Sequence, residues 1–158
     1  MRTTIFAAAA AAAVAVIATT TFADAAPKAA GTTTTITTTM NLTGVTSVDA
    51  DRNGVPSAGD YELFSEVDHN AAGAVVGNGT AICFQTDGAA KQFTCSGETD
   101  FGANEIQVAF RFFPASKAFH AAILGGTGKY DGAYGSMTGT WLDAKESKAS
   151  VVFTITTR

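Results

Sequence analysis

The sequence predicts an all-β protein, an eight-stranded antiparallel β-barrel with no substantial helix after the first 25 residues. Three observations carry this prediction. Beyond residue 31, apolar and polar residues alternate with a period of two, as in strands that bury one face. Turn-forming residues divide these runs into short segments at even intervals. No window there combines a helical period with helix caps.

Residues 1–25 are interpreted as a cleaved signal peptide. Arg2 gives a positive start, residues 5–17 are apolar and rich in alanine, and Ala23-Asp24-Ala25 has the small-x-small cleavage pattern. This apolar run of about 13 residues is shorter than the roughly 20 that a membrane-spanning helix needs. It also lacks the polar face of an amphipathic anchor. We therefore expect no membrane span, a flexible leader over 26–31, and a secreted, extracellular domain over 32–158.

Charge and its distribution exclude two classes of partner. The chain has 10 Lys and Arg against 14 Asp and Glu, and the basic residues are scattered along it. Nucleic-acid binding requires basic side chains grouped against phosphates. Attraction to an anionic lipid surface requires a similar cluster. We expect neither nucleic acid nor a membrane surface as a partner.

Each expected strand is β-branched or alternating and is bounded by turn residues. The eight are Thr32–Leu42, Tyr61–Val67, Val75–Thr86, Gln92–Ser96, Glu105–Phe113, Phe119–Leu124, Gly135–Leu142 and Ser150–Thr156. Eight antiparallel strands can close into a barrel, which removes exposed edges and encloses room for one small ligand. A two-sheet sandwich has the same periodicity and stays open as the alternative.

Cys83 and Cys95 are expected to form a disulfide across a hairpin. Residues 87–91 have the composition of a turn, and the two cysteines are symmetric about Ala89. Directly opposed residues at a non-hydrogen-bonded position have Cα atoms ~4.5 Å apart, within disulfide reach. Export permits the oxidised form. Two free thiols are the alternative, whereas structural zinc needs more ligands than two cysteines.

A glycine-rich segment between the sixth and seventh expected strands is the most identifiable motif. It does not match either nucleotide fingerprint, since Tyr130 follows Gly128-Lys129 and Asp131 replaces a required glycine. We expect no cofactor. The glycines are expected to adopt positive φ in a tight connection that the two tyrosines pack down. The motif residues are Gly125, Gly126, Gly128, Tyr130, Gly132, Tyr134 and Gly135.

With Ile123-Leu124 in front, this segment resembles the corresponding stretch of allene oxide cyclases and is similar to that of the related dirigent proteins. The dirigent form carries arginines where this chain has Asp131 and Tyr134, so the cyclase form is closer. Upstream likenesses are residues 56–60 with Leu63-Phe64, Val76-Gly77, Gly79 and Cys83. The resemblance implies a calycin-like or lipocalin-like barrel, often trimeric, whose apolar lumen folds a reactive molecule into one ring or stereoisomer.

Four residues are candidates for catalysis. By the resemblance, Asn41 matches an asparagine on the first strand of the family. Tyr61, Glu66 and Arg111 are the polar groups that would matter if they faced the lumen. Strand parity places Tyr61 and Glu66 on opposite faces of one strand. Either the apolar strand faces line the lumen, or another subunit covers an apolar outer surface.

The loop from Asp49 to Asp60 suggests a separate hypothesis. Oxygen-bearing residues stand at its positions one, three, five, nine and twelve, with glycine at six, which is the ligand spacing of a calcium loop. Three features differ from a calcium loop: Pro56, a final Asp in place of Glu, and the lack of flanking helices in the sequence pattern. The composition is also that of an ordinary surface loop. We assign no metal ligand, and calcium stays open.

The sequence thus predicts a secreted barrel that binds a small apolar molecule in its lumen and cyclises or isomerises it stereoselectively. Such a reaction can proceed by holding a flexible substrate close to its reactive conformation. A non-catalytic carrier and a structural barrel are the alternatives. Both ligand-binding hypotheses require a cavity, expected at about 300 Å³ or more.

Overall fold

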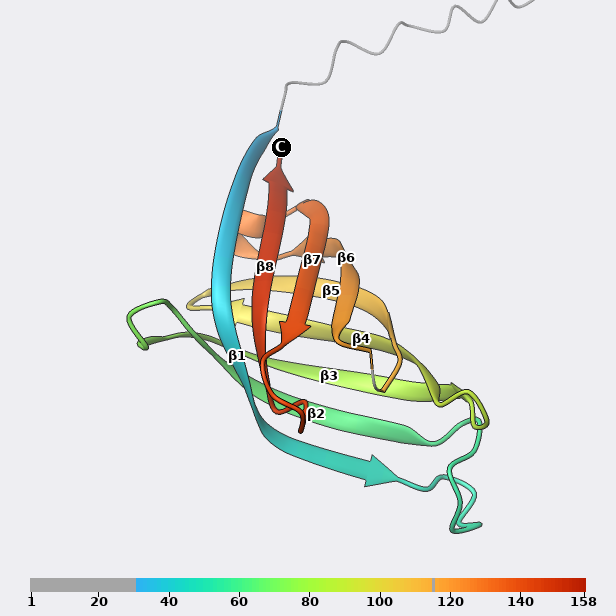
Figure 1. The fold of residues 1–158 in the computed structure, drawn as a ribbon. Coiled ribbons are helices and arrows are strands. Elements are labelled where there is room, and N and C mark those ends of the chain that lie inside the picture. The colour runs from blue at the N-terminus through green and yellow to red at the C-terminus, as the bar shows by residue number, and fades with distance from the viewer. Residues whose placement is uncertain (1–30, 115) are drawn as a thin grey trace, which may run out of the picture.

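The computed structural model describes residues 31–114 and 116–158, and within them eight antiparallel strands form a closed barrel (Figure 1). The strands are β1 (Thr32–Val48), β2 (Tyr61–His69), β3 (Val75–Asp87), β4 (Gln92–Phe101), β5 (Asn104–Phe112), β6 (Ala118–Gly126), β7 (Tyr134–Trp141) and β8 (Lys148–Thr157). Each pairs with the next, and β8 pairs with β1. This confirms the eight-stranded barrel and excludes the sandwich. The expected signal, 1–25, and leader residues 26–30 lie outside the described residues.

Strand β1 closes the barrel by pairing with two neighbours in turn. Its first part, Thr32 to Asn41, lies along β8, and its second part, from Thr39 to Val48, lies along β2. The bend between the two is visible in Figure 1 and coincides with a register shift between Leu42 and Gly44. The strand therefore continues six residues beyond its predicted end at Leu42, because pairing with β2 resumes after the shift.

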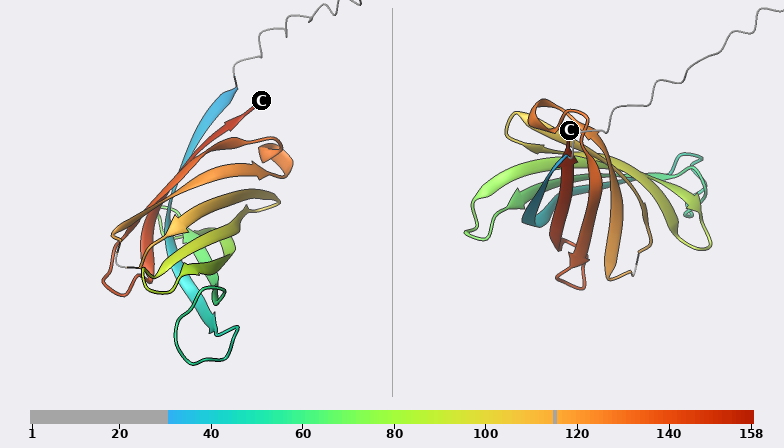
Figure 2. Two further views of the ribbon diagram at one scale, coloured as in Figure 1. Left: turned by 90° about the vertical axis from the view of Figure 1, so that its right-hand side faces the viewer. Right: turned by 90° about the horizontal axis from the view of Figure 1, so that it is seen from above.

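The connections alternate between two ends of the barrel, as antiparallel order requires (Figure 2). The loops 49–60, 88–91 and 142–147, with residues 113–114 and 116–117, surround one end, here called the mouth. The other, closed end carries the loops 70–74, 102–103 and 127–133. Inward side chains pack the closed end. Phe153, Ile155 and Ile106 are fully buried there, and the Phe101 ring contacts Phe153 edge-on at 5.4 Å between centroids.

The glycine-rich segment forms the tight connection at the closed end. Gly128 and Gly132 adopt φ of 60° and 64°, values that side chains disfavour, and a short 3-10 turn, η1 (Gly128–Tyr130), lies between β6 and β7. Tyr130 is 3% exposed and packs against Phe101, as expected, whereas Tyr134 remains 47% exposed. Among the described residues, no helix is long and apolar enough to span a membrane.

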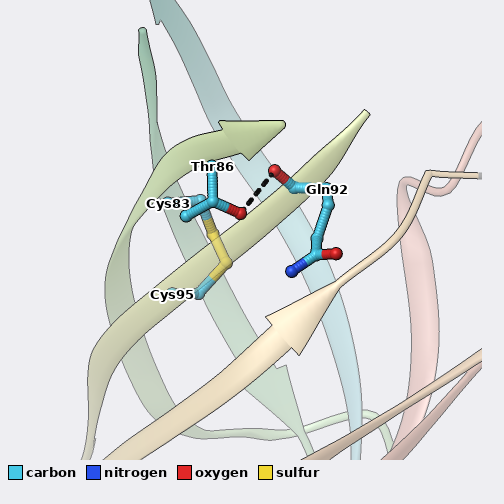
Figure 3. Close-up of a disulfide and its surroundings, with 4 residues drawn as sticks. All are labelled: Cys83, Thr86, Gln92 and Cys95. Atoms are coloured by element: carbon cyan, nitrogen blue, oxygen red, sulfur yellow. Dashed lines mark hydrogen bonds between the residues drawn. A yellow bond between two sulfur atoms is a disulfide. The ribbon is translucent and has the colours of Figure 1, made fainter. Parts of the chain in front are cut away.

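The disulfide between Cys83 and Cys95 is present and joins β3 to β4 (Figure 3). The two residues are direct partners in the strand register, with their Cα atoms 4.0 Å apart. Both are buried on the lumen face towards the mouth, where Phe93 packs with them. Nearer the turn, the Thr86 hydroxyl donates to the carbonyl of Gln92 at 3.2 Å. The hairpin register predicted from the cysteine spacing is confirmed.

Candidate functional site

A cavity of about 60 Å³ lies in the lumen, between the packed closed end and the mouth. A hollow of about 490 Å³ at the mouth shares Leu42, Phe64, Phe112 and Trp141 with it. The central cavity is far smaller than the 300 Å³ or so expected, because large aromatic side chains fill the lumen. The cavity size expected from the sequence is therefore wrong for the lumen alone, and a ligand of ordinary size would have to extend from the cavity into the mouth hollow.

One side of this space is an aromatic wall, formed by Phe110 and Phe112 of β5, Phe119 of β6 and Trp141 of β7. Their rings contact one another, with centroids 5.2 Å apart for Phe119 and Trp141 and 6.3 Å for Phe112 and Trp141. Gly139 faces Phe119 in the register, and a β-carbon there would overlap the Phe119 ring. The glycine thus allows this ring to lie across β7.

The opposite side carries Glu66 on β2. Glu66 pairs with Gly79 of β3, which pairs in turn with Thr99 of β4. A β-carbon on Gly79 would lie 2.7 Å from Oε1 of Glu66, so the glutamate side chain occupies the space that the missing side chain leaves. Its Oε1 accepts a long hydrogen bond, 3.5 Å, from the Thr99 hydroxyl. Three adjacent strands thereby position one carboxyl group in the cavity wall.

Burial shapes the proton affinity of this carboxyl group. Loss of solvation raises the pKa of Glu66 from its ordinary 4.5 to about 7, Asp68 adds charge repulsion, and the Thr99 hydrogen bond opposes both. The described residues that line the cavity include Glu66 and Glu98 but no Lys, Arg or His. Glu66 therefore holds a proton that it can donate and recover near neutral pH.

Asp68 lies one inward position deeper than Glu66, about 7 Å further along β2. It is 1% exposed and accepts a hydrogen bond of 2.7 Å from the Thr38 hydroxyl on Oδ1. Its Oδ2 has no hydrogen-bond partner. Burial raises the pKa of Asp68, against the hydrogen bond from Thr38 and the nearby His69. A second carboxyl group thus supports the protonated form of Glu66 from below.

The two walls face each other across the lumen. In a ring of eight strands, β2 and β6 are four strands apart in either direction and are therefore opposite. The carboxyl groups come from β2, and the aromatic wall is centred on β6. The Trp141 side chain lines the cavity, whereas its Nε1 is buried and has no hydrogen-bond partner. The cavity therefore combines a carboxyl group with stacked aromatic rings.

Of the four predicted site residues, Glu66 lines the cavity and the others do not. Arg111 is exposed on the outer face of β5, at opposite parity to the buried Val108. Tyr61 packs outside the barrel on Phe84, with centroids 5.7 Å apart. Asn41 also faces outwards, and its amide donates to Nδ1 of His69 at 2.8 Å. The apolar strand faces line the lumen, which places alternate residues outside.

The structure adds Asp68 and Trp141 to the site, neither of which the sequence indicated. Asp68 has the parity of Glu66, but the expected strand ended at Val67, whereas β2 continues to His69. Trp141 lies within the expected strand Gly135–Leu142, without any motif around it, and is the last residue of β7. Strand parity alone could have found Asp68, once β2 was known to reach His69.

The loop 49–60 brings three carboxylates together. Oxygens of Asp49, Asp51 and Asp60 lie within 4.8 Å of one another. The same carboxylates accept hydrogen bonds from backbone amides of the loop. Gly54 donates to Asp49 at 2.8 Å, and Ala50 donates to Asp60 at 2.9 Å. The hydrogen bond from Gly54 lowers the pKa of Asp49. Such hydrogen bonds also shape an ordinary loop, so calcium binding stays a hypothesis.

No protein-family model and no curated protein matches the sequence. Solved structures share the fold. A pyocyanin demethylase aligns with a TM-score of 0.66 and 24% identity over 77% of this chain and 99% of its own. A pterocarpan synthase dirigent protein gives 0.63 and 16%, over 82% and 86%. A Diels-Alderase from Streptomyces koyangensis gives 0.62 and 12%, over 79% and 69%.

These likenesses support a dirigent-like and cyclase-like barrel fold. At such identities they concern the fold alone. The allene oxide cyclase part of the resemblance stays a prediction.

Proposed function

We propose that this chain is a secreted barrel that binds a small, largely apolar molecule in its lumen and cyclises or isomerises it by proton transfer. The observation that carries the proposal is the Glu66 carboxyl group, which sits in an otherwise largely apolar cavity with a pKa of about 7. A cavity wall without any ionisable group would instead favour a non-catalytic carrier. The barrel neighbours that act as dirigent proteins or cyclases lend support.

In this proposal Glu66 works as a general acid and base. Its O–H bond breaks as the proton passes to a carbonyl oxygen, ring nitrogen or double bond of the substrate, which leaves a carboxylate. The carboxylate then takes a proton from another position of the rearranged substrate, so that the enzyme returns to its starting form. The substrate gains and loses one proton, and no redox partner is required. The aromatic wall holds the reacting conformation.

The proposal is tested by mass spectrometry of small molecules that co-purify with the exported protein. We expect one compound class to co-purify with both the wild type and Glu66→Gln, with the isomerised product only in the wild type. Glu105→Gln is the matched control, because Glu105 lies outside the cavity and pairs with Gln107. If Glu66→Gln and Glu105→Gln yield equal amounts of the isomerised product, Glu66 is not the acid. A bound compound without any product in the wild type would favour the carrier.

We also propose a homotrimer, as the family resemblance implies. Large apolar side chains remain exposed on the outer face, among them Leu63, Phe84 and Leu124. A groove of about 590 Å³ runs between Leu63, Ile82 and Leu124. Exposed apolar patches of this kind usually mark interfaces. Light scattering of the wild type and of Leu124→Lys tests this, and a wild type that is monomeric at micromolar concentration contradicts it.

A further inference from the structure

We propose that the lumen binds flat nitrogen heteroaromatic molecules, as protonated cations or as bases that accept the Glu66 proton, and discriminates against anionic aromatic molecules of the same shape. The inference rests on the proposed ligand-binding function and names its substrate class. It follows from the placement of the carboxyl groups opposite the aromatic wall.

The aromatic wall sets the shape of the ligand. Phe110 contacts Phe119 with ring centroids 5.9 Å apart, and Phe119 contacts Trp141 at 5.2 Å. Together with Phe112, they give three neighbouring strands an almost continuous aromatic lining from the cavity to the mouth hollow. Such a surface contacts a flat ring system over a large area, by offset or edge-to-face packing. It also attracts a cation, because ring faces are electronegative.

The carboxyl groups set the charge of the ligand. Glu66 lines the cavity, Asp68 lies beneath it, and the described lining of the cavity has no Lys, Arg or His. The mouth hollow, into which a ligand would extend, is lined by Lys145 together with Glu62 and Glu146. A ligand carboxylate inside the cavity would therefore meet Glu66 without a cation beside it, at a site where burial weakens screening. A ring N–H⁺ instead forms a charge-assisted hydrogen bond to Glu66. Both walls therefore favour a cation.

Proton transfer from Glu66 would allow the site to bind a ligand that arrives as a neutral base as well. When a ring nitrogen takes the proton, the O–H bond of Glu66 breaks and an N–H bond forms, leaving a carboxylate beside a cation. The net charge of the site is unchanged by the transfer. Such a ligand satisfies the Glu66 carboxyl group while its rings pack on the aromatic wall.

Trp141 is the only tryptophan of the chain and lines the site, so its fluorescence reports on ligands in the lumen. The probes are three tricyclic molecules of like shape: 9-aminoacridine, a cation; 9-anthracenemethanol, neutral; and anthracene-9-carboxylate, an anion. Affinities are measured by quenching at about pH 8, where Glu66 is ionised. We expect the cation to bind at least about tenfold more tightly than the anion.

Variants then assign the preference to Glu66. Glu66→Gln should reduce the cation-to-anion ratio by about tenfold, whereas Glu105→Gln, which removes the same charge outside the lumen, should leave it unchanged. An anion that binds the wild type as tightly as the cation overturns the inference, even if the neutral probe shows that the lumen binds ligands. A ratio that Glu66→Gln leaves unchanged overturns it too. If no probe quenches Trp141, both the inference and the proposed ligand site fail.

Discussion

The Glu66→Gln substitution is expected to change how stability depends on pH. An acid whose pKa rises on folding keeps its proton in the folded state after the unfolded chain has lost it. For Glu66 this occurs between its ordinary pKa of 4.5 and the raised value of about 7. Within that window the unfolded state binds fewer protons, so the free energy of unfolding falls as pH rises. Below 4.5 both states are protonated, and the penalty is absent.

The magnitude follows from the width of the window. One pH unit corresponds to about 1.4 kcal/mol, so the interval from 4.5 to about 7 corresponds to roughly 3–4 kcal/mol at most. Water admitted through the mouth reduces this value. Glutamine stays neutral at every pH, fills the space beside Gly79 and can still accept from Thr99. As the pH rises from about 4 to about 8, the free energy of unfolding of the variant should therefore increase relative to the wild type by up to this amount.

Urea denaturation followed by circular dichroism at several pH values measures the difference, with Glu105→Gln as control. Burial raises the pKa of Asp68 in both proteins, so the difference reports Glu66 together with its repulsion from Asp68. The reasoning is refuted if the difference between Glu66→Gln and the wild type stays constant from about pH 4 to pH 8, to within about 0.5 kcal/mol.

The remaining predictions concern the frame around the site. Replacing both cysteines with alanine opens a link between residues 12 apart and should lower the free energy of unfolding by about 3 kcal/mol; unchanged urea midpoints would contradict this. Gly139→Ala should cost about 1–3 kcal/mol by displacing Phe119, whereas Gly125→Ala, whose added β-carbon meets open space, should cost less; equal melting temperatures argue against the packing. Arg111→Ala should leave 9-aminoacridine affinity unchanged, since Arg111 is exposed outside the barrel, and a clear loss in the quenching titration would place Arg111 in the site.

Much of the fold was predictable because its signals are local. Alternation with a period of two identifies strands wherever one face is buried. The spacing of Cys83 and Cys95 about one turn predicted their register, and the glycines near Tyr130 predicted a tight connection at positive φ. Strand ends were less predictable. β1 extends beyond Leu42 because its second half pairs with β2, a partner that local pattern does not reveal.

By itself, the sequence determined an all-β chain, a hairpin disulfide and a pair of alternating faces on each strand. Only the tertiary structure decided which face is inside, and hence that Glu66 lines the lumen while Tyr61 and Arg111 lie outside. The physical reason is that the pKa of Glu66, and the position of its strand opposite the aromatic wall, both depend on closure of the barrel. Closure removes water from Glu66 and places β2 opposite β6, although these strands are about 50 residues apart in the chain.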